Sequence, residues 1–165
     1  MVGYLDDLDA AQVPKGRRVL AALGPKMLKL SAERAAGAHP YLTTPEHTRK
    51  AREILGPGVL LAPEQKIVLD TDPVRARSIG RPVVAKPYLG LVNYTSNLRS
   101  LGYTDADLAG GGSDPLIDAL VDHGDAGTVA AGLTKHLEAG ADQLLTSPGD
   151  DPVAGFTSLA RALFG

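Results

Sequence analysis

The stretch that decides the fold is Arg18-Val-Leu-Ala-Ala-Leu-Gly-Pro-Lys-Met27, in which a short apolar run meets the start of a helix. Residues 19–23 have the length and the side chains of a buried strand. Gly24 frees the backbone at a turn, and Pro25 suits the first helical position because its missing N–H needs no partner there. The free N–H groups of such a helix face the end of the strand, and this geometry binds anions, phosphates above all. An ordinary connection between a strand and a helix gives the same pattern, so both interpretations stay open.

The composition is that of a soluble globular protein. The chain has 165 residues, enough for one domain, with 44% hydrophobic and 22% charged residues. A net charge of −2 without a basic tail argues against binding to nucleic acid or to anionic membranes. The lack of cysteine excludes disulfides, thiolate metal sites and cysteine nucleophiles. No apolar segment has membrane-spanning length and no secretion signal is visible, so we expect a cytoplasmic protein.

Strand-like and helix-like segments alternate along the chain. Strands are expected at 18–23, 37–42, 61–69 and 142–146. This alternation predicts a parallel sheet whose strands end at one common rim, where ligands bind in α/β proteins. A helical segment over 72–124 separates the third strand from the last, and Gly80, Pro82 and Pro87 are expected to break or kink its helices.

The other reactive side chains form no recognisable catalytic pattern. No histidine has metal-ligand spacing, and neither a Walker loop nor a nucleophile elbow occurs, so we assign no metal site and no catalytic residue. His39 lies in a predicted strand and is a candidate to line a pocket. Glu64 and Lys66 lie two apart on one strand, so they share a face and are expected to pair. The remaining histidines are expected at the surface: His47, His123 and His136.

Four phrases of the sequence carry a resemblance to a known family. They are RRVLAALGPKMLKLSAERAAGAHPYLTTPEH (17–47), LLAPEQKIVLDTDPVRAR (60–77), YLGLVNYTSNLRSLGYTDADL (88–108) and HLEAGADQLL (136–145). In this order they resemble the C-terminal half of luciferase-like monooxygenases, in the branch of oxidoreductases that use the deazaflavin coenzyme F420. The resemblance covers nearly the whole chain.

The resemblance implies a fold, since family members are (β/α)8 TIM barrels of about 250 residues. We therefore expect an α/β fold that is a partial (β/α)8 TIM barrel, a single domain over 1–165 with a helical insertion at 72–124 before the final strand. Its parallel strands correspond to the last four of the family barrel, and the first four have no counterpart. An open half-barrel exposes two edge strands, so we expect a homo-oligomer or pairing with a separate N-terminal half-barrel.

The resemblance also implies a cofactor site. In the family, the loop after the fifth barrel strand binds the cofactor phosphate through backbone N–H groups. The corresponding residues here are Ala22, Leu23, Gly24, Pro25 and Lys26. Because proline cannot donate, the expected donors are the N–H groups of Gly24, Lys26 and Met27. The Lys26 side chain either adds charge or points to solvent.

The end of the sixth family strand supplies further groups to the same phosphate in some members. The residues in that region are Tyr41, Thr43 and Thr44. We include Tyr41 and Thr43 in the cofactor site, with helix capping as the alternative for Thr43. For Thr44 we favour capping of the following helix.

The implied function is that of an oxidoreductase or monooxygenase that depends on a flavin or deazaflavin and transfers hydride to a small organic substrate. The expected cofactor is coenzyme F420, with FMN as the alternative. Two other functions stay open. The chain is either a non-catalytic half-barrel that binds a flavin or another phosphorylated ligand, or a truncated product stabilised by self-association.

Overall fold

Three short parallel strands form the first sheet of the computed structural model, which describes residues 1–147 and 151–165. β1 (Val19–Leu20), β2 (Gly37–Ala38) and β3 (Leu60–Leu61) lie side by side in that order. A side chain at Gly37 would not fit, because a Cβ there would lie 2.1 Å from the carbonyl oxygen of Leu60. The strands predicted at 18–23 and 37–42 are thus confirmed in position, although the regular pairing is shorter than the apolar runs. The single strand predicted at 61–69 is wrong in one respect, because it is divided between β3 and a strand of a second sheet.

A second pair of parallel strands joins β4 (Lys66–Val68) to β5 (Val121–His123). Between β3 and β4, Glu64 forms a single parallel bridge with Leu145. The predicted last strand at 142–146 is reduced to this bridge in the described part of the chain. The structure is therefore an α/β fold with parallel strands, as the alternation of segments predicted.

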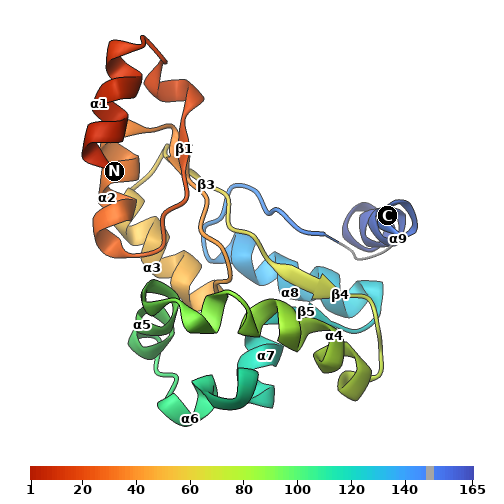
Figure 1. The fold of residues 1–165 in the computed structure, drawn as a ribbon. Helices are drawn as coiled ribbons and strands as arrows, with labels where there is room; N and C mark the ends of the chain where they lie inside the picture. The colour runs from red at the N-terminus through yellow and green to blue at the C-terminus, as the bar shows by residue number, and fades with distance from the viewer. Residues whose placement is uncertain (148–150) are drawn as a thin grey trace.

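Helices make up most of the chain (Figure 1). Their bounds are α1 Val2–Ala10, α2 Pro25–Arg34, α3 Pro45–Leu55, α4 Pro73–Ala85, α5 Val92–Ser100, α6 Asp105–Leu108, α7 Asp114–Leu120, α8 Ala126–Glu138 and α9 Pro152–Phe164. Short 3-10 helices occupy Lys15–Arg17, Tyr88–Gly90 and Ala109–Gly111. α2 and α3 pack against each other and against the first sheet, and Leu28 and Leu61 belong to the core between them.

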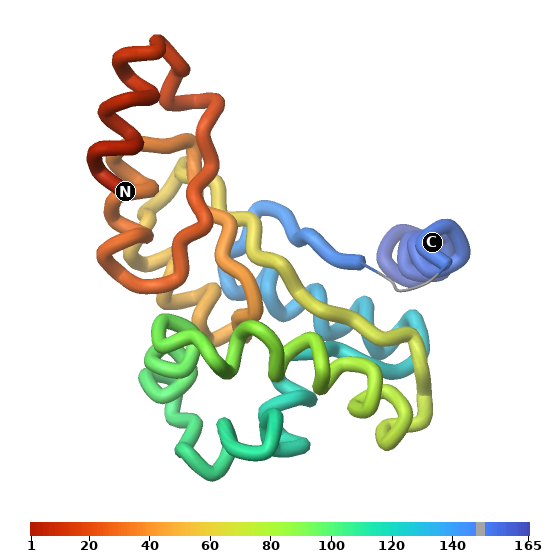
Figure 2. Tube along the Cα trace, viewed as in Figure 1, coloured from red at the N-terminus to blue at the C-terminus, as the bar shows by residue number. Residues whose placement is uncertain are grey.

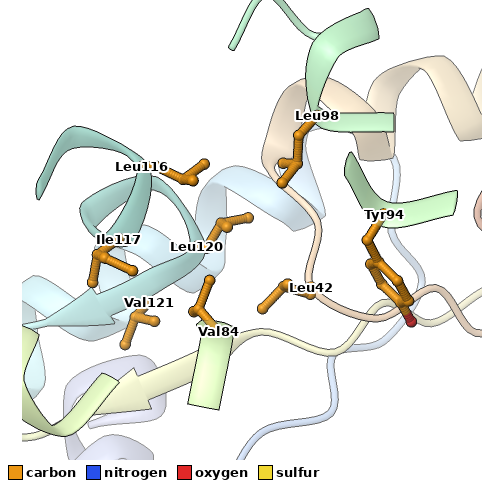
Figure 3. Close-up of a cluster of buried hydrophobic side chains, with 8 residues drawn as sticks. All are labelled: Leu42, Val84, Tyr94, Leu98, Leu116, Ile117, Leu120 and Val121. Carbon is orange, nitrogen blue, oxygen red and sulfur yellow. The ribbon is translucent and has the colours of Figure 1, made fainter. Parts of the chain in front are cut away.

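The segment from α4 to α7 forms a helical group with its own core (Figures 2 and 3). The buried members of this core are Leu42, Val84, Tyr94, Leu98, Leu116, Ile117, Leu120 and Val121. Leu23 and Tyr41, which follow β1 and β2, pack against the same core. The helical group therefore covers the carboxyl ends of the first two strands.

Two predictions for this segment are wrong. Val121–His123 lies within the expected helical insertion at 72–124 but is strand β5, because Val121 is β-branched and buried beside β4. α4 is continuous through Gly80 and Pro82, whereas we expected breaks there. Gly80 is a packing point, since a Cβ on it would lie 3.0 Å from a methyl group of Val121, and Pro82 lies in the last turn of the helix.

Candidate functional site

The start of α2 differs from an ordinary helix start because no side chain caps it. Gly24 is the N-cap residue and Pro25 takes the first helical position. Gly24 has φ −87° and ψ 163°, which any residue adopts, so the conformational freedom expected of glycine is not used here. A Cβ added to Gly24 would have no atom within 4 Å. Because glycine has no side chain, the N-terminus of α2 is left without a cap.

Two of the three expected N–H donors are free in this structure. The N–H of Met27 donates to the carbonyl of Gly24 at 3.0 Å, so it is used inside the first turn and is not available to a ligand. Within residues 1–147 and 151–165, no acceptor is recorded for the N–H groups of Gly24 and Lys26. Exposed N–H groups and the helix dipole together give this end of α2 a positive electrostatic potential.

A cavity of about 510 Å³ opens at this helix start. It is lined by Ala21, Ala22, Leu23, Gly24, Pro25, Lys26, Met27, His39, Pro40, Tyr41, Asn93 and Tyr94. Seven of the eight residues expected at the cofactor site thus line this one cavity. The described lining contains a lysine and no carboxylate, so the cavity favours an anion over a cation.

Thr43 is the expected site residue that the structure does not bring to the cavity. It is fully buried, and its hydroxyl group has no hydrogen-bond partner among the described residues. Leu42, between Tyr41 and Thr43, has φ 50°, and this left-handed conformation changes the course of the chain there. Tyr41 consequently lines the cavity, whereas Thr43 faces the interior.

His39 and Tyr41 form a wall shared with a second cavity of about 340 Å³. Their rings meet edge to face with centroids 4.5 Å apart, and the His39 ring is hydrogen-bonded through Nδ1 to the carbonyl of Ala62. His39 therefore lines a pocket, as the sequence suggested. The second cavity is completed by Glu64, Tyr88, Leu145, Thr146 and Ser147.

Glu64 and Lys66 form the expected ion pair, with Nζ and Oε1 2.5 Å apart. Both side chains are about one-quarter exposed or less. The pair neutralises the carboxylate of Glu64 at the edge of the second cavity. That cavity therefore offers polar groups without a strong excess of charge.

The sequence reasoning missed the wall that the helical group supplies, Asn93 and Tyr94 of α5. Tyr94 packs edge to face on Tyr88 with centroids 4.8 Å apart. Burial raises the pKa of Tyr94 to about 12, so its hydroxyl keeps its proton and remains a hydrogen-bond donor at neutral pH. The signal that could have found it was the phrase YLGLVNY, which ends on Tyr94.

Two histidines expected at the surface are buried instead. His47 is 4% exposed and its Nε2 lies 2.8 Å from the carbonyl oxygen of Leu23. His136 is 1% exposed and is bonded through Nδ1 to the hydroxyl of Thr48 and through Nε2 to Oε1 of Gln65. Burial lowers the pKa of both rings, that of His136 to about 4, so both are neutral at pH 7.

Two other features are absent from the part of the chain that the structure describes. No group of His, Asp and Glu there is arranged to hold a metal ion. Among the same residues, none of the helices combines the length and apolar character needed to cross a bilayer.

Comparison with solved structures finds the same fold in F420-dependent enzymes. An F420-dependent secondary alcohol dehydrogenase, solved in complex with an F420-acetone adduct, superposes with a TM-score of 0.59 at 14% identity, over 89% of this chain and 48% of that enzyme. The coenzyme F420-dependent tetrahydromethanopterin reductase from Methanopyrus kandleri gives a TM-score of 0.60 at 22% identity, over 86% of this chain and 48% of that enzyme.

Sequence comparisons add no assignment. No protein-family model matches the chain, and no curated protein matches it. The chain spans about half the length of each of the two enzymes. Since both are below 25% identical to it, the likeness establishes a shared α/β fold with parallel strands and many helices.

Proposed function

We propose that this chain is the phosphate-binding part of an F420-dependent oxidoreductase of the luciferase-like family. The observation that carries the proposal is the uncapped start of α2, which opens into a cavity whose described lining has a lysine and no carboxylate. The shared fold with two F420-dependent enzymes supports the same assignment. The sequence resemblance, made from the residues alone, points to the same family.

The residues present fit the phosphate-bearing tail of such a cofactor. The N–H groups of Gly24 and Lys26 would each donate a hydrogen bond to a phosphate oxygen, and Lys26 is itself a lining residue of the cavity. The missing side chain of Gly24 leaves room for the phosphate to approach the backbone. Thr43 is left out of this proposal because it is buried away from the cavity.

The rest of the cofactor would lie along the wall formed by His39 and Tyr41, which connects the two cavities. A deazaflavin supplies hydride chemistry when bound, and the protein supplies position and exclusion of water. Tyr94 would close the cavity from the side of the helical group and keep a hydroxyl donor near the ligand. FMN carries the same kind of phosphate tail and is the alternative cofactor.

The test is titration of the purified chain with coenzyme F420 and with FMN, followed by absorbance and fluorescence. Gly24→Asp should weaken binding about a hundredfold, ~2.7 kcal/mol, because its carboxylate takes the free N–H groups and repels phosphate. Gly24→Ala is the matched control and should lose much less affinity than Gly24→Asp, since its Cβ meets no protein atom and brings no charge. Binding of neither cofactor would sink the proposal. Binding without hydride transfer to any carbonyl substrate would leave the non-catalytic binding function.

We also propose that the chain pairs with a further half-barrel, either a second copy or a separate N-terminal half. β1 has one strand neighbour among the described residues, and Val19 on it is 47% exposed. An edge strand with exposed apolar side chains is a site for strand pairing. Sedimentation at micromolar concentration should show a species larger than one chain, and a compact monomer would contradict this proposal.

A further inference from the structure

The Leu23–Gly24 peptide group is held from behind by a residue of another helix. His47 is the third residue of α3, and its own N–H donates to the hydroxyl of Thr44 at 3.3 Å. Its ring reaches the connection between β1 and α2, where Nε2 lies 2.8 Å from the carbonyl oxygen of Leu23. Since a carbonyl oxygen only accepts, Nε2 must carry the ring proton and donate it.

The other ring nitrogen agrees with this assignment. Nδ1 of His47 is buried without a hydrogen-bond partner among the described residues, as fits a nitrogen that carries no proton. Burial lowers the pKa of His47, so the ring stays neutral at pH 7 and keeps one N–H. A buried polar atom without a partner lowers stability, so the ring is retained here at a cost.

Because the peptide bond is planar, the hydrogen bond to the Leu23 carbonyl also fixes the direction of the Gly24 N–H. In a trans peptide the C=O and the N–H lie in one plane and point in opposite directions. The carbonyl of Leu23 points toward His47 in α3, so the N–H of Gly24 points away from α3. The described lining of the 510 Å³ cavity includes Leu23 and Gly24 and contains no residue of α3. The N–H of Gly24 thus points away from α3, which contributes no lining residue to this cavity.

We infer that His47 is a positioning residue that fixes the Leu23–Gly24 peptide so that its N–H, and not its carbonyl, faces the bound phosphate. The inference rests on the proposed function and adds a requirement to it. If the peptide turned over, the negative end of its dipole would meet the phosphate, and the free donor of Gly24 would be lost. His47 acts through the backbone and touches no ligand itself.

The experiment uses the full chain and FMN, with inorganic phosphate as a second probe. His47→Leu keeps an apolar side chain of similar size and removes the donor, so the dissociation constant for FMN should rise at least tenfold. His47→Gln supplies an amide N–H and should restore the constant to within about threefold. Thermal unfolding of each variant separates loss of the fold from loss of the donor.

His136 offers a matched control. It is also a buried, neutral histidine. It lies in α8 and is hydrogen-bonded to Thr48 of α3, the helix that carries His47. His136→Leu should destabilise the chain about as much as His47→Leu does but leave the affinity for FMN unchanged. Equal losses of affinity in the two leucine variants would show a general effect of destabilisation and overturn the role of His47.

Two spectroscopic readouts do not depend on the variants remaining folded. The ¹⁵N spectrum of the unchanged chain should show His47 with its proton on Nε2, and a proton on Nδ1 would overturn the inference. Phosphate should shift the amide signal of Gly24 strongly. If the unchanged chain binds neither FMN nor phosphate, the proposed function fails together with the inference. If His47→Leu binds FMN normally, only the inference fails.

Discussion

The N-termini of α2 and α3 share a local sequence pattern but differ in their capping. Each helix follows a strand of the first sheet, and each has proline at its first position. At α3, the Thr44 hydroxyl accepts the N–H of His47, and Glu46 adds negative charge to the first turn. At α2 the N-cap is Gly24, without a side chain, and the first turn contains no acidic residue.

The difference shows which helix start is complete by itself. At α3, the Thr44 hydroxyl satisfies the N–H of His47, and a carboxylate complements the helix dipole. α2 leaves both tasks undone and adds Lys26, a charge that is unfavourable at the positive end of a helix. A bound phosphate would supply both missing features to α2, which is why the open start is the better candidate for a ligand site.

The largest expected effect tests what holds α2 in place when its start is open. Leu28 is buried in the core with Ala38, Ala51 and Leu61. Leu28→Ala should lower the free energy of unfolding by about 2–5 kcal/mol, because the lost contacts leave a cavity. Urea denaturation checks this, with exposed Lys29→Ala on the same helix as the control. Equal urea midpoints for the two variants would mean that packing does not anchor α2.

The next effect concerns His136, the buried histidine of α8 that is hydrogen-bonded to Thr48 of α3. The pKa of His136 falls from 6.5 to about 4 through burial, so between these pH values the unfolded chain binds a proton that the folded chain does not. Stability should therefore fall as the pH drops from 6.5 to 4, by ~3 kcal/mol for this group when fully expressed. His136→Gln should show a smaller loss over the same range.

Asp122 acts in the opposite direction. Burial raises its pKa from 3.8 to about 6, so the folded chain takes up a proton between pH 6 and 3.8 and is stabilised there. Asp122→Asn should remove this offset and make the fall in stability on acidification steeper. Urea midpoints at several pH values between 7 and 4.5 measure both variants. Parallel curves for all three chains would show that these groups do not control the acid response.

A smaller effect is expected at the closed start of α3. Thr44→Ala removes the hydroxyl that accepts the N–H of His47 and should cost about 1 kcal/mol of stability. Thr44→Ser keeps the acceptor and should lose much less. Binding of FMN should stay within a few-fold in Thr44→Ser. A stability of Thr44→Ala equal to that of the unchanged chain would mean that this cap contributes nothing.

The smallest effect is expected from adding a capping side chain at the N-terminus of α2. Gly24→Ser supplies a hydroxyl to the first turn and should raise stability by a few tenths of a kcal/mol. The same hydroxyl competes with a phosphate for the N–H groups, so affinity for FMN should fall. Calorimetry and titration on one sample show the two changes together. A rise in both stability and affinity would break the contrast between the two helix starts.

Local signals were enough for the elements whose ends are fixed by neighbouring residues. The turn at Gly24-Pro25, the cap at Thr44 and the pair of Glu64 with Lys66 each involve residues within a few positions of one another. Their geometry follows from turn chemistry, capping and the alternation of side chains along a strand. These predictions were confirmed for that reason.

Contacts between distant segments could not be read in the same way. His136 is buried because Thr48 and Gln65, far away in the sequence, meet it. β5 is a strand because β4 lies beside it, although its residues follow a helix without a break. Tyr94 reaches the cavity because the helical group packs on Leu23 and Tyr41. Each outcome depends on long-range packing, which overrides local preference.

By itself, the sequence determined the alternation of strands and helices, the bare glycine before α2 and the absence of a carboxylate from its first turn. These features depend on residue type and on spacing along the chain. Only the tertiary structure decided that His47 lies behind the Leu23–Gly24 peptide and that α5 closes the cavity in front of it. The direction of a peptide N–H is set by what its carbonyl bonds to, and here that partner comes from a helix 24 residues further along the chain.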